Sequence, residues 1–246
     1  MTDYSLKVTG DERTGFPLVT LMIPATDTTP ALAFQVGWMP LTWVQLEYFL
    51  AETFDRRFDA AWYQNMLSRS GRISANSLAR FSDFPSLFVR GLTLQEVQII
   101  GRWWGGDRFI VPTVKQWQEV QQVALGQPPA NLEAFNIEPP LSPRAIGASK
   151  ALEGLAATSD IQRNLADQML LRGGLRELVM LESGNATVVG IGNPSRAVEA
   201  FNSDSLLKLD EGNRSRRIEV GMRLFLKLEK NVTQGENNGI AVKDLS

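Results

Sequence analysis

The chain of 246 residues contains no cysteine and no histidine. Without cysteine it has no disulfides, thiolate nucleophiles, zinc ribbons or iron–sulfur sites. Without histidine it lacks the usual near-neutral acid or base, the usual transition-metal ligand and a Ser-His-Asp triad. Any chemistry must therefore come from carboxylate, amine, hydroxyl and backbone groups. A bound metal would be a hard cation with oxygen ligands, such as calcium.

The chain also lacks an excess of charge and a long apolar run. Its net charge is −2, which gives no sign of a nucleic-acid partner. The first fifteen residues are polar, and no run of 18 apolar residues occurs, so we expect neither a secretory signal nor a membrane partner. The sequence therefore predicts a cytoplasmic protein. With 43% hydrophobic residues, a chain of this length can form a stable core without disulfides or a structural metal. We expect one domain over residues 1–246, with its core in 16–229 and a polar tail in 230–246.

The first half of the chain carries clear local signals. Residues 16–25 and 31–40 are rich in apolar, β-branched and aromatic residues and predict two strands, with a turn at residues 27–30. Three capping boxes then predict helices, because a Thr is followed three residues later by Gln or Glu. These pairs are Thr42 with Gln45, Thr93 with Glu96, and Thr113 with Gln116. A short strand-like run at 108–111 precedes the third.

The second half is less regular. Residues 126–149 are rich in proline and predict an irregular excursion, the alternative being a linker between two domains. A helix is expected from Ser159 to Leu171, followed by a hairpin of strands at 175–183 and 187–192. Residues 219–229 predict a last strand with alternating faces. Its apolar face would hold Val220, Met222, Leu224, Leu226 and Leu228, and its opposite face Arg223, Lys227 and Glu229.

Four segments in this order resemble the formylglycine-generating enzyme family, also called the sulfatase-modifying factor family. "MPLTWVQLEYFL" (Met39–Leu50) resembles its first strand-to-helix element, and "LTLQEVQIIGRWWGGDRFIVPTVKQW" (Leu92–Trp117) its next two helices. "GGLRELV" (Gly173–Val179) is similar to the family's "GNVWEW" segment, and "GMRLFL" (Gly221–Leu226) to its last strand. The resemblance implies an α+β, C-type-lectin-like fold: short antiparallel sheets, flanking helices and much irregular loop.

The departures from the family bear on function. Family members bind copper through two cysteines, and a related branch holds iron through histidines, so both activities lack their ligands here. The family's "GNVWEW" Asn often helps a structural calcium site, but Gly174 stands at that position. Glu177 remains as a candidate calcium ligand. Its structural alternative is a surface or salt-bridged carboxylate. No other cofactor is expected.

The remaining candidates are residues for binding a partner. Arg214, Arg216 and Arg217 form a basic run, which is either a solvated turn or an edge that recognises carboxylates or phosphates. In the fold of the resembled family, loops that lead into the last strand line the ligand face, and Asn193 lies in the loop 190–196. Trp103 and Trp104 are adjacent, so one should be core and the other half exposed; Trp104 is our candidate for an interface anchor.

These observations favour a non-catalytic binding module that recognises a protein partner. The resemblance implies a bacterial setting in a regulatory or defence system. Two alternatives remain open: an enzyme that uses only oxygen and amine side chains, and a calcium-dependent carbohydrate binder. The enzyme would need a concave pocket with converging carboxylates or a desolvated lysine.

Overall fold

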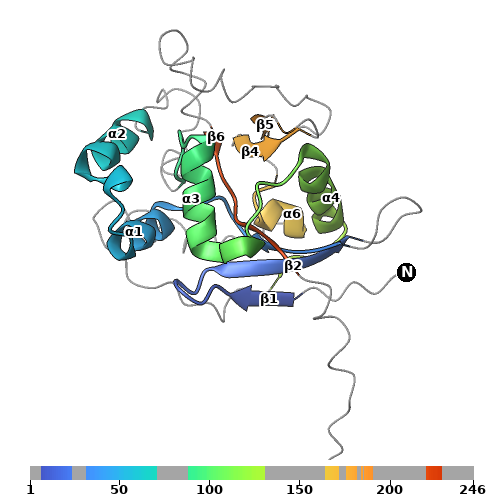
Figure 1. Cartoon of the computed structure of the whole chain (residues 1–246). Coiled ribbons are helices and arrows are strands. Elements are labelled where there is room, and N and C mark those ends of the chain that lie inside the picture. The colour runs from blue at the N-terminus through green and yellow to red at the C-terminus, as the bar shows by residue number, and fades with distance from the viewer. Residues whose placement is uncertain are drawn as a thin grey trace, which may run out of the picture.

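The computed structural model shows a mixed α and β protein in which helices pack around two small sheets (Figure 1). It describes residues 7–23, 32–70, 88–130, 164–171, 176–181, 184, 186–190 and 220–228. The expected turn at 27–30, most of the proline-rich excursion and the tail lie outside these residues.

The larger sheet has four antiparallel strands in the order β1-β2-β3-β7. They are β1 (Lys7–Gly10), β2 (Pro17–Ile23), β3 (Leu32–Gly37) and β7 (Phe225–Lys227). The strands predicted at 16–25 and 31–40 are confirmed as β2 and β3. The sequence did not predict β1, a four-residue edge strand. The strand-like run before the third helix contributes only a single bridge, between Phe109 and Leu226.

All three predicted capping boxes are present. They open α1 (Trp43–Glu52), α3 (Leu94–Gly105) and α4 (Val114–Leu125). In each, the Thr hydroxyl accepts a hydrogen bond of 3.2 Å from the backbone N–H three residues on, and the Gln or Glu side chain accepts from the Thr backbone N–H. These bonds satisfy backbone donors that have no partner within the helix, and they fix where each helix begins.

Two helical features differ from the expectation. The 3₁₀ helix η1 (Arg56–Phe58) and helix α2 (Ala60–Ser70) follow α1 in a segment for which the sequence analysis predicted no helix. Near residue 165, the described chain forms only the short helix α6 (Leu165–Gln168), capped by Asn164. The sequence predicted a helix that begins at Ser159. Because the backbone of Asn164 is extended, α6 begins only after Asn164, so this predicted start is wrong.

The smaller sheet has the order β5-β4-β6. Its strands are β4 (Arg176–Met180), β5 (Ala186–Gly190) and β6 (Val220–Gly221). The predicted hairpin is confirmed, because β4 and β5 pair antiparallel. The predicted continuous last strand is wrong: β6 pairs with β4, and β7 pairs with β3 in the larger sheet. Residues 222–224 between them therefore connect the two sheets.

One hydrophobic cluster extends through the sheets and helices, with members from Phe16 to Leu226. Helix α4 contacts β2 on one side and β4 and α6 on others, which places it between the sheets. Close packing at α3 depends on two glycines. A Cβ atom at Gly101 would lie 2.1 Å from the ring of Phe109, and one at Gly105 would lie 2.2 Å from Leu226. No helix within the described ranges is long and apolar enough to cross a membrane.

Candidate functional site

A buried polar cluster brings together three segments that are distant in the sequence. Trp117 comes from the first turn of α4, Glu177 from β4, and Arg223 from the connection between β6 and β7. The guanidinium of Arg223 donates from Nε and Nη2 to Glu177, with Nη2–Oε1 at 2.6 Å and Nε–Oε1 at 3.0 Å. The indole Nε1 of Trp117 donates to Glu177 Oε2 at 3.0 Å. Both carboxylate oxygens therefore accept hydrogen bonds from protein donors.

The cluster also reaches the larger sheet. Arg223 Nη1 donates to the carbonyl oxygen of Gly37, at the end of β3, at 2.8 Å. The side chains of Arg223 and Glu177 are 0% and 1% exposed. Removing two charges from water costs several kcal/mol per ion, so a buried pair persists only with good geometry and further hydrogen bonds. Here Trp117 and Gly37 supply those bonds, and the cluster ties α4 to both sheets.

This environment corrects the assignment of Glu177 as a calcium ligand. Its carboxylate is buried and engaged by a cation and an indole N–H, which is the salt-bridged alternative. A calcium ion at the same oxygens would face the guanidinium of Arg223. In the ranges that the structure describes, no group of three or more acidic side chains is arranged to hold a metal ion.

Arg223 does not lie on a separate polar face of the last strand, opposite Met222 and Leu224, as the alternating pattern predicted. Arg223 is buried, and so are its neighbours Met222 and Leu224. Buried and exposed side chains do not alternate here because residues 222–224 are not part of a strand. A signal for the pair was present: Glu177 and Arg223 have opposite charges, Arg223 lies between Met222 and Leu224, and Glu177 directly precedes the apolar run Leu178–Met180. Charged residues are almost never fully buried unless they are paired.

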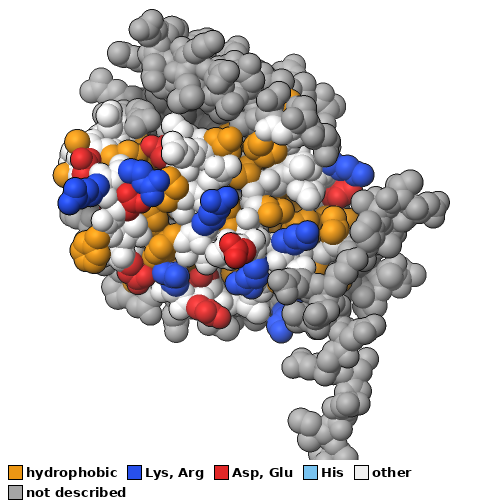
Figure 2. Space-filling view, in the orientation of Figure 1, with side chains coloured by type: hydrophobic (Ala, Val, Ile, Leu, Met, Phe, Trp, Pro, Cys, Tyr) orange, Lys and Arg blue, Asp and Glu red, His pale blue; other side chains and the backbone are white. Residues whose placement is uncertain are grey.

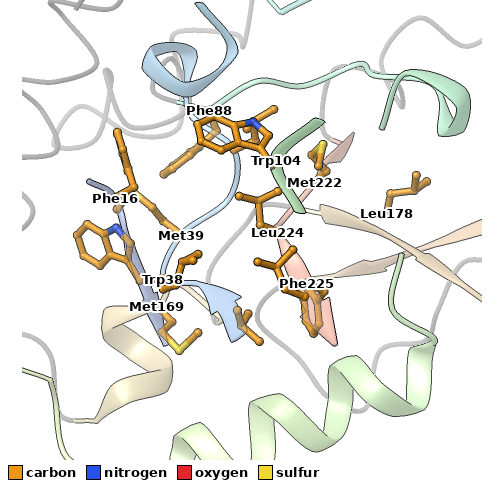
Figure 3. Close-up of a cluster of buried hydrophobic side chains, with 14 of the residues drawn as sticks. Phe16, Trp38, Met39, Phe88, Trp104, Met169, Leu178, Met222, Leu224 and Phe225 are labelled. Atoms are coloured by element: carbon orange, nitrogen blue, oxygen red, sulfur yellow. The ribbon is translucent and has the colours of Figure 1, made fainter. Parts of the chain in front are cut away.

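Trp104 is not the half-exposed member of its pair. It is 8% exposed, and Figure 3 shows its indole within the cluster of buried hydrophobic side chains. Its neighbour Trp103 is the partly exposed one. The guanidinium of Arg13 stacks 4.0 Å from the ring centre of Trp103, and Arg13 Nη1 donates to Glu52 at 3.0 Å. Trp103 therefore lies under an ion pair at the surface.

The other predicted partner-binding residues, Arg214, Arg216, Arg217 and Asn193, lie outside the described residues. On the face shown in Figure 2, cationic and anionic side chains are interspersed over the described surface, with hydrophobic ones between them. Charges of one sign do not gather on this described face, so it offers no strongly basic or acidic patch.

One surface feature was not predicted from the sequence, namely the short connection between α1 and η1. Phe54 lies at its centre and is 97% exposed. Asp55 caps η1 by accepting from the backbone N–H of Arg57 at 3.0 Å, and the Arg57 guanidinium donates to the same carboxylate. These hydrogen bonds hold the pKa of Asp55 at about 2, below its ordinary value of 3.8. An exposed Phe between an acidic helix end and a cap residue has no distinctive sequence signal.

Comparisons of the chain with family models, with curated proteins and with solved structures found no match.

Proposed function

We propose that the chain is a non-catalytic binding module on a scaffold like that of the formylglycine-generating enzymes, with a C-type-lectin-like fold. One observation carries the proposal. Trp117, Glu177 and Arg223 come from three of the segments on which the sequence resemblance rests, and they meet in one buried cluster. The residues that resemble the family therefore hold the elements together.

The chemistry of the cluster supports a structural role. Each oxygen of Glu177 accepts a hydrogen bond, and the Arg223 guanidinium is divided between Glu177 and the Gly37 carbonyl. A catalytic carboxylate must be reachable by substrate, but this one is 1% exposed. The chain also has no Cys or His, which are the residues that bind copper or iron in the family. A scaffold retained without its reactive groups is suited to presenting a surface.

The partner that we propose is a protein in a bacterial regulatory or defence system. The recognising residues would be the basic run of Arg214, Arg216 and Arg217, together with Asn193. Arginine forks bind carboxylates in a bidentate manner, so an acidic segment of the partner suits them.

The proposal can be tested by co-expressing the chain with each product of its flanking genes, one of them carrying an affinity tag. We expect one product to retain the chain. Replacing all three arginines by Glu should abolish retention, whereas the matched control Lys115→Glu on α4 should preserve it. Retention that survives the triple replacement would refute the proposed face. Failure of both products to bind, at concentrations that saturate a micromolar complex, would refute the proposed partner.

A further inference from the structure

The turn between β1 and β2 is connected to two helices by one side chain. Arg13 lies in this turn, which Figure 1 shows beneath α1 and α3. Its guanidinium lies 4.0 Å from the ring centre of Trp103 on α3, and its Nη1 donates at 3.0 Å to Glu52, the last residue of α1. We call these two interactions together the Arg13 contact.

The turn has a shape of its own that does not depend on the Arg13 side chain. The Asp11 carboxylate accepts from the backbone N–H of Thr14 at 2.8 Å and from its hydroxyl at 2.7 Å. The N–H of Gly15, whose φ is 73°, donates to the Asp11 carbonyl at 2.8 Å, and the Asp11 N–H donates to the Phe16 carbonyl at 2.8 Å. The Arg13 contact therefore fixes where the turn lies on the helices, whereas local hydrogen bonds form the turn.

The ring that Arg13 covers is fixed by the core. Trp103 is half-buried, and it packs edge to face on Phe49 at 5.3 Å and on Trp104 at 4.7 Å between ring centres. Phe49 and Trp104 are buried. Only the turn therefore has to move for the Arg13 contact to break, because Trp103 keeps its packing on the two core rings.

The Arg13 contact is weak, and its strength depends on ionic strength. The side chains of Arg13 and Glu52 are 40% and 53% exposed, so water and salt reach the ion pair. Surface ion pairs and exposed cation–π contacts each add little stability. Salt also screens the ion pair, because the Debye length falls from about 10 Å at 0.1 M to about 3 Å at 1 M.

Strand β1 gives the turn little further support. It has four residues and is the edge strand of the larger sheet, and among the described strands it pairs with β2 alone. Segments at an edge with few buried contacts open locally at a lower free-energy cost than the core does. The Arg13 contact is therefore a large part of what holds this edge of the molecule in place.

We propose that the Arg13 contact is a salt-sensitive latch on the β1–β2 turn. At low ionic strength it holds the turn and β1 against α1 and α3. At high ionic strength it opens, and the face of Trp103 that Arg13 covers becomes accessible to solvent. The opening is local, because the core beneath Trp103 stays packed. This conformational change is independent of the proposed function and of any partner.

Amide hydrogen exchange of the full chain, followed for single residues by NMR, tests the proposal. Arg13→Gln should raise the exchange rates of the Asp11 and Gly15 amides about 2- to 30-fold, as expected when a surface ion pair and an exposed cation–π contact are both lost. The Gly37 amide, which donates to the Leu224 carbonyl at 2.9 Å, should exchange as before, because it lies at the end of β3 in the core.

Salt provides the second measurement. Raising NaCl from about 0.05 M to about 1 M should bring the exchange rates of the Asp11 and Gly15 amides in the wild type up to those of Arg13→Gln at the same salt. The rates of Arg13→Gln, corrected for the effect of salt on unstructured peptides, should stay constant. The NMR signal of the Trp103 indole N–H should shift with salt in the wild type but not in Arg13→Gln.

Arg102→Gln is the matched control, because it removes the same charge from an exposed position on α3 beside Trp103. It should leave the exchange of the Asp11 and Gly15 amides unchanged. Thermal unfolding verifies that each variant is folded. The proposal is overturned if Arg13→Gln leaves both turn amides unchanged, if it accelerates the Gly37 amide equally, or if salt affects Arg13→Gln and the wild type alike.

Discussion

Arg223 and Glu177 form an ion pair that is fully enclosed by protein, with Nη2 and Oε1 at 2.6 Å. The two residues lie 46 positions apart in the chain. Arg223 also reaches Gly37, so the pair links the smaller sheet to β3 of the larger one. The position of one charge in the core is therefore determined by the other.

Glu177→Gln should lower the free energy of unfolding by about 3–5 kcal/mol, because it leaves the buried Arg223 guanidinium without its counter-charge. Urea denaturation measures this change. Glu52→Gln is the matched control, since Glu52 pairs with Arg13 at the surface, where such a pair is worth only about 0–1 kcal/mol. Equal costs for the two variants would show that the buried pair does not stabilise the fold.

Trp117→Phe should cost more stability than Trp104→Phe. Both indoles are buried, but only Trp117 donates to a carboxylate, whereas Trp104 Nε1 has no hydrogen-bond partner within the described part of the chain. Both substitutions remove the same ring volume, so that cost largely cancels in the comparison. The remaining difference in the free energy of unfolding is about 1.5–3 kcal/mol, the contribution of a hydrogen bond to a charged acceptor. Urea denaturation of the two variants gives the difference. A larger cost for Trp104→Phe would contradict the role assigned to Trp117.

Gly101→Ala should destabilise the protein by about 1–3 kcal/mol through overpacking, because its Cβ would lie 2.1 Å from the Phe109 ring. Gly126→Ala is the control at the end of α4. Its backbone is right-handed helical and a Cβ there would meet only Val123 oxygen at 3.6 Å, so a gain of about 0.4–1 kcal/mol is expected. Melting temperatures should therefore move in opposite directions. A fall with Gly126→Ala, or no fall with Gly101→Ala, would contradict the packing argument.

Arg57→Gln should raise the pKa of Asp55 from about 2 towards 3.8, because it removes the side-chain hydrogen bonds that are the largest cause of the shift. A lowered native pKa means that this carboxylate stabilises the fold above pH 4. That contribution is lost as the pH falls from about 4 to about 2. Carbon-13 NMR of the Asp55 carboxyl follows the titration. Arg56→Gln, the neighbouring control, should leave the pKa of Asp55 unchanged. An equal effect of both variants would show that the loss of a nearby positive charge, rather than the Arg57 contact, shifts this pKa.

The sequence predicted the elements whose causes are local. The capping boxes at Thr42, Thr93 and Thr113 were correct because a helix start depends on residues within one turn. Strands β2 and β3 were recognisable because their β-branched and aromatic residues pack on a half-buried sheet.

Errors occurred where distant contacts override local pattern. Strand β1 is short and polar, and it forms because β2 offers it an edge. The alternation expected around Arg223 failed because the chain there leaves one sheet and enters the other, so both of its sides are buried. Spacing alone could not show which of Trp103 and Trp104 is buried. In the folded chain Trp104 is buried, whereas Trp103 is half-buried between the core ring of Phe49 and the exposed Arg13.

By itself, the sequence determined the chemistry that the chain lacks and the starts of its main helices, since composition and capping need no knowledge of the fold. Only the tertiary structure decided which charged side chains are buried and with which groups they pair. Glu177 looked like a candidate calcium ligand until Arg223 and Trp117 were found against its oxygens. The physical reason is that burying a charge is costly, and only the folded chain shows which distant group offsets that cost.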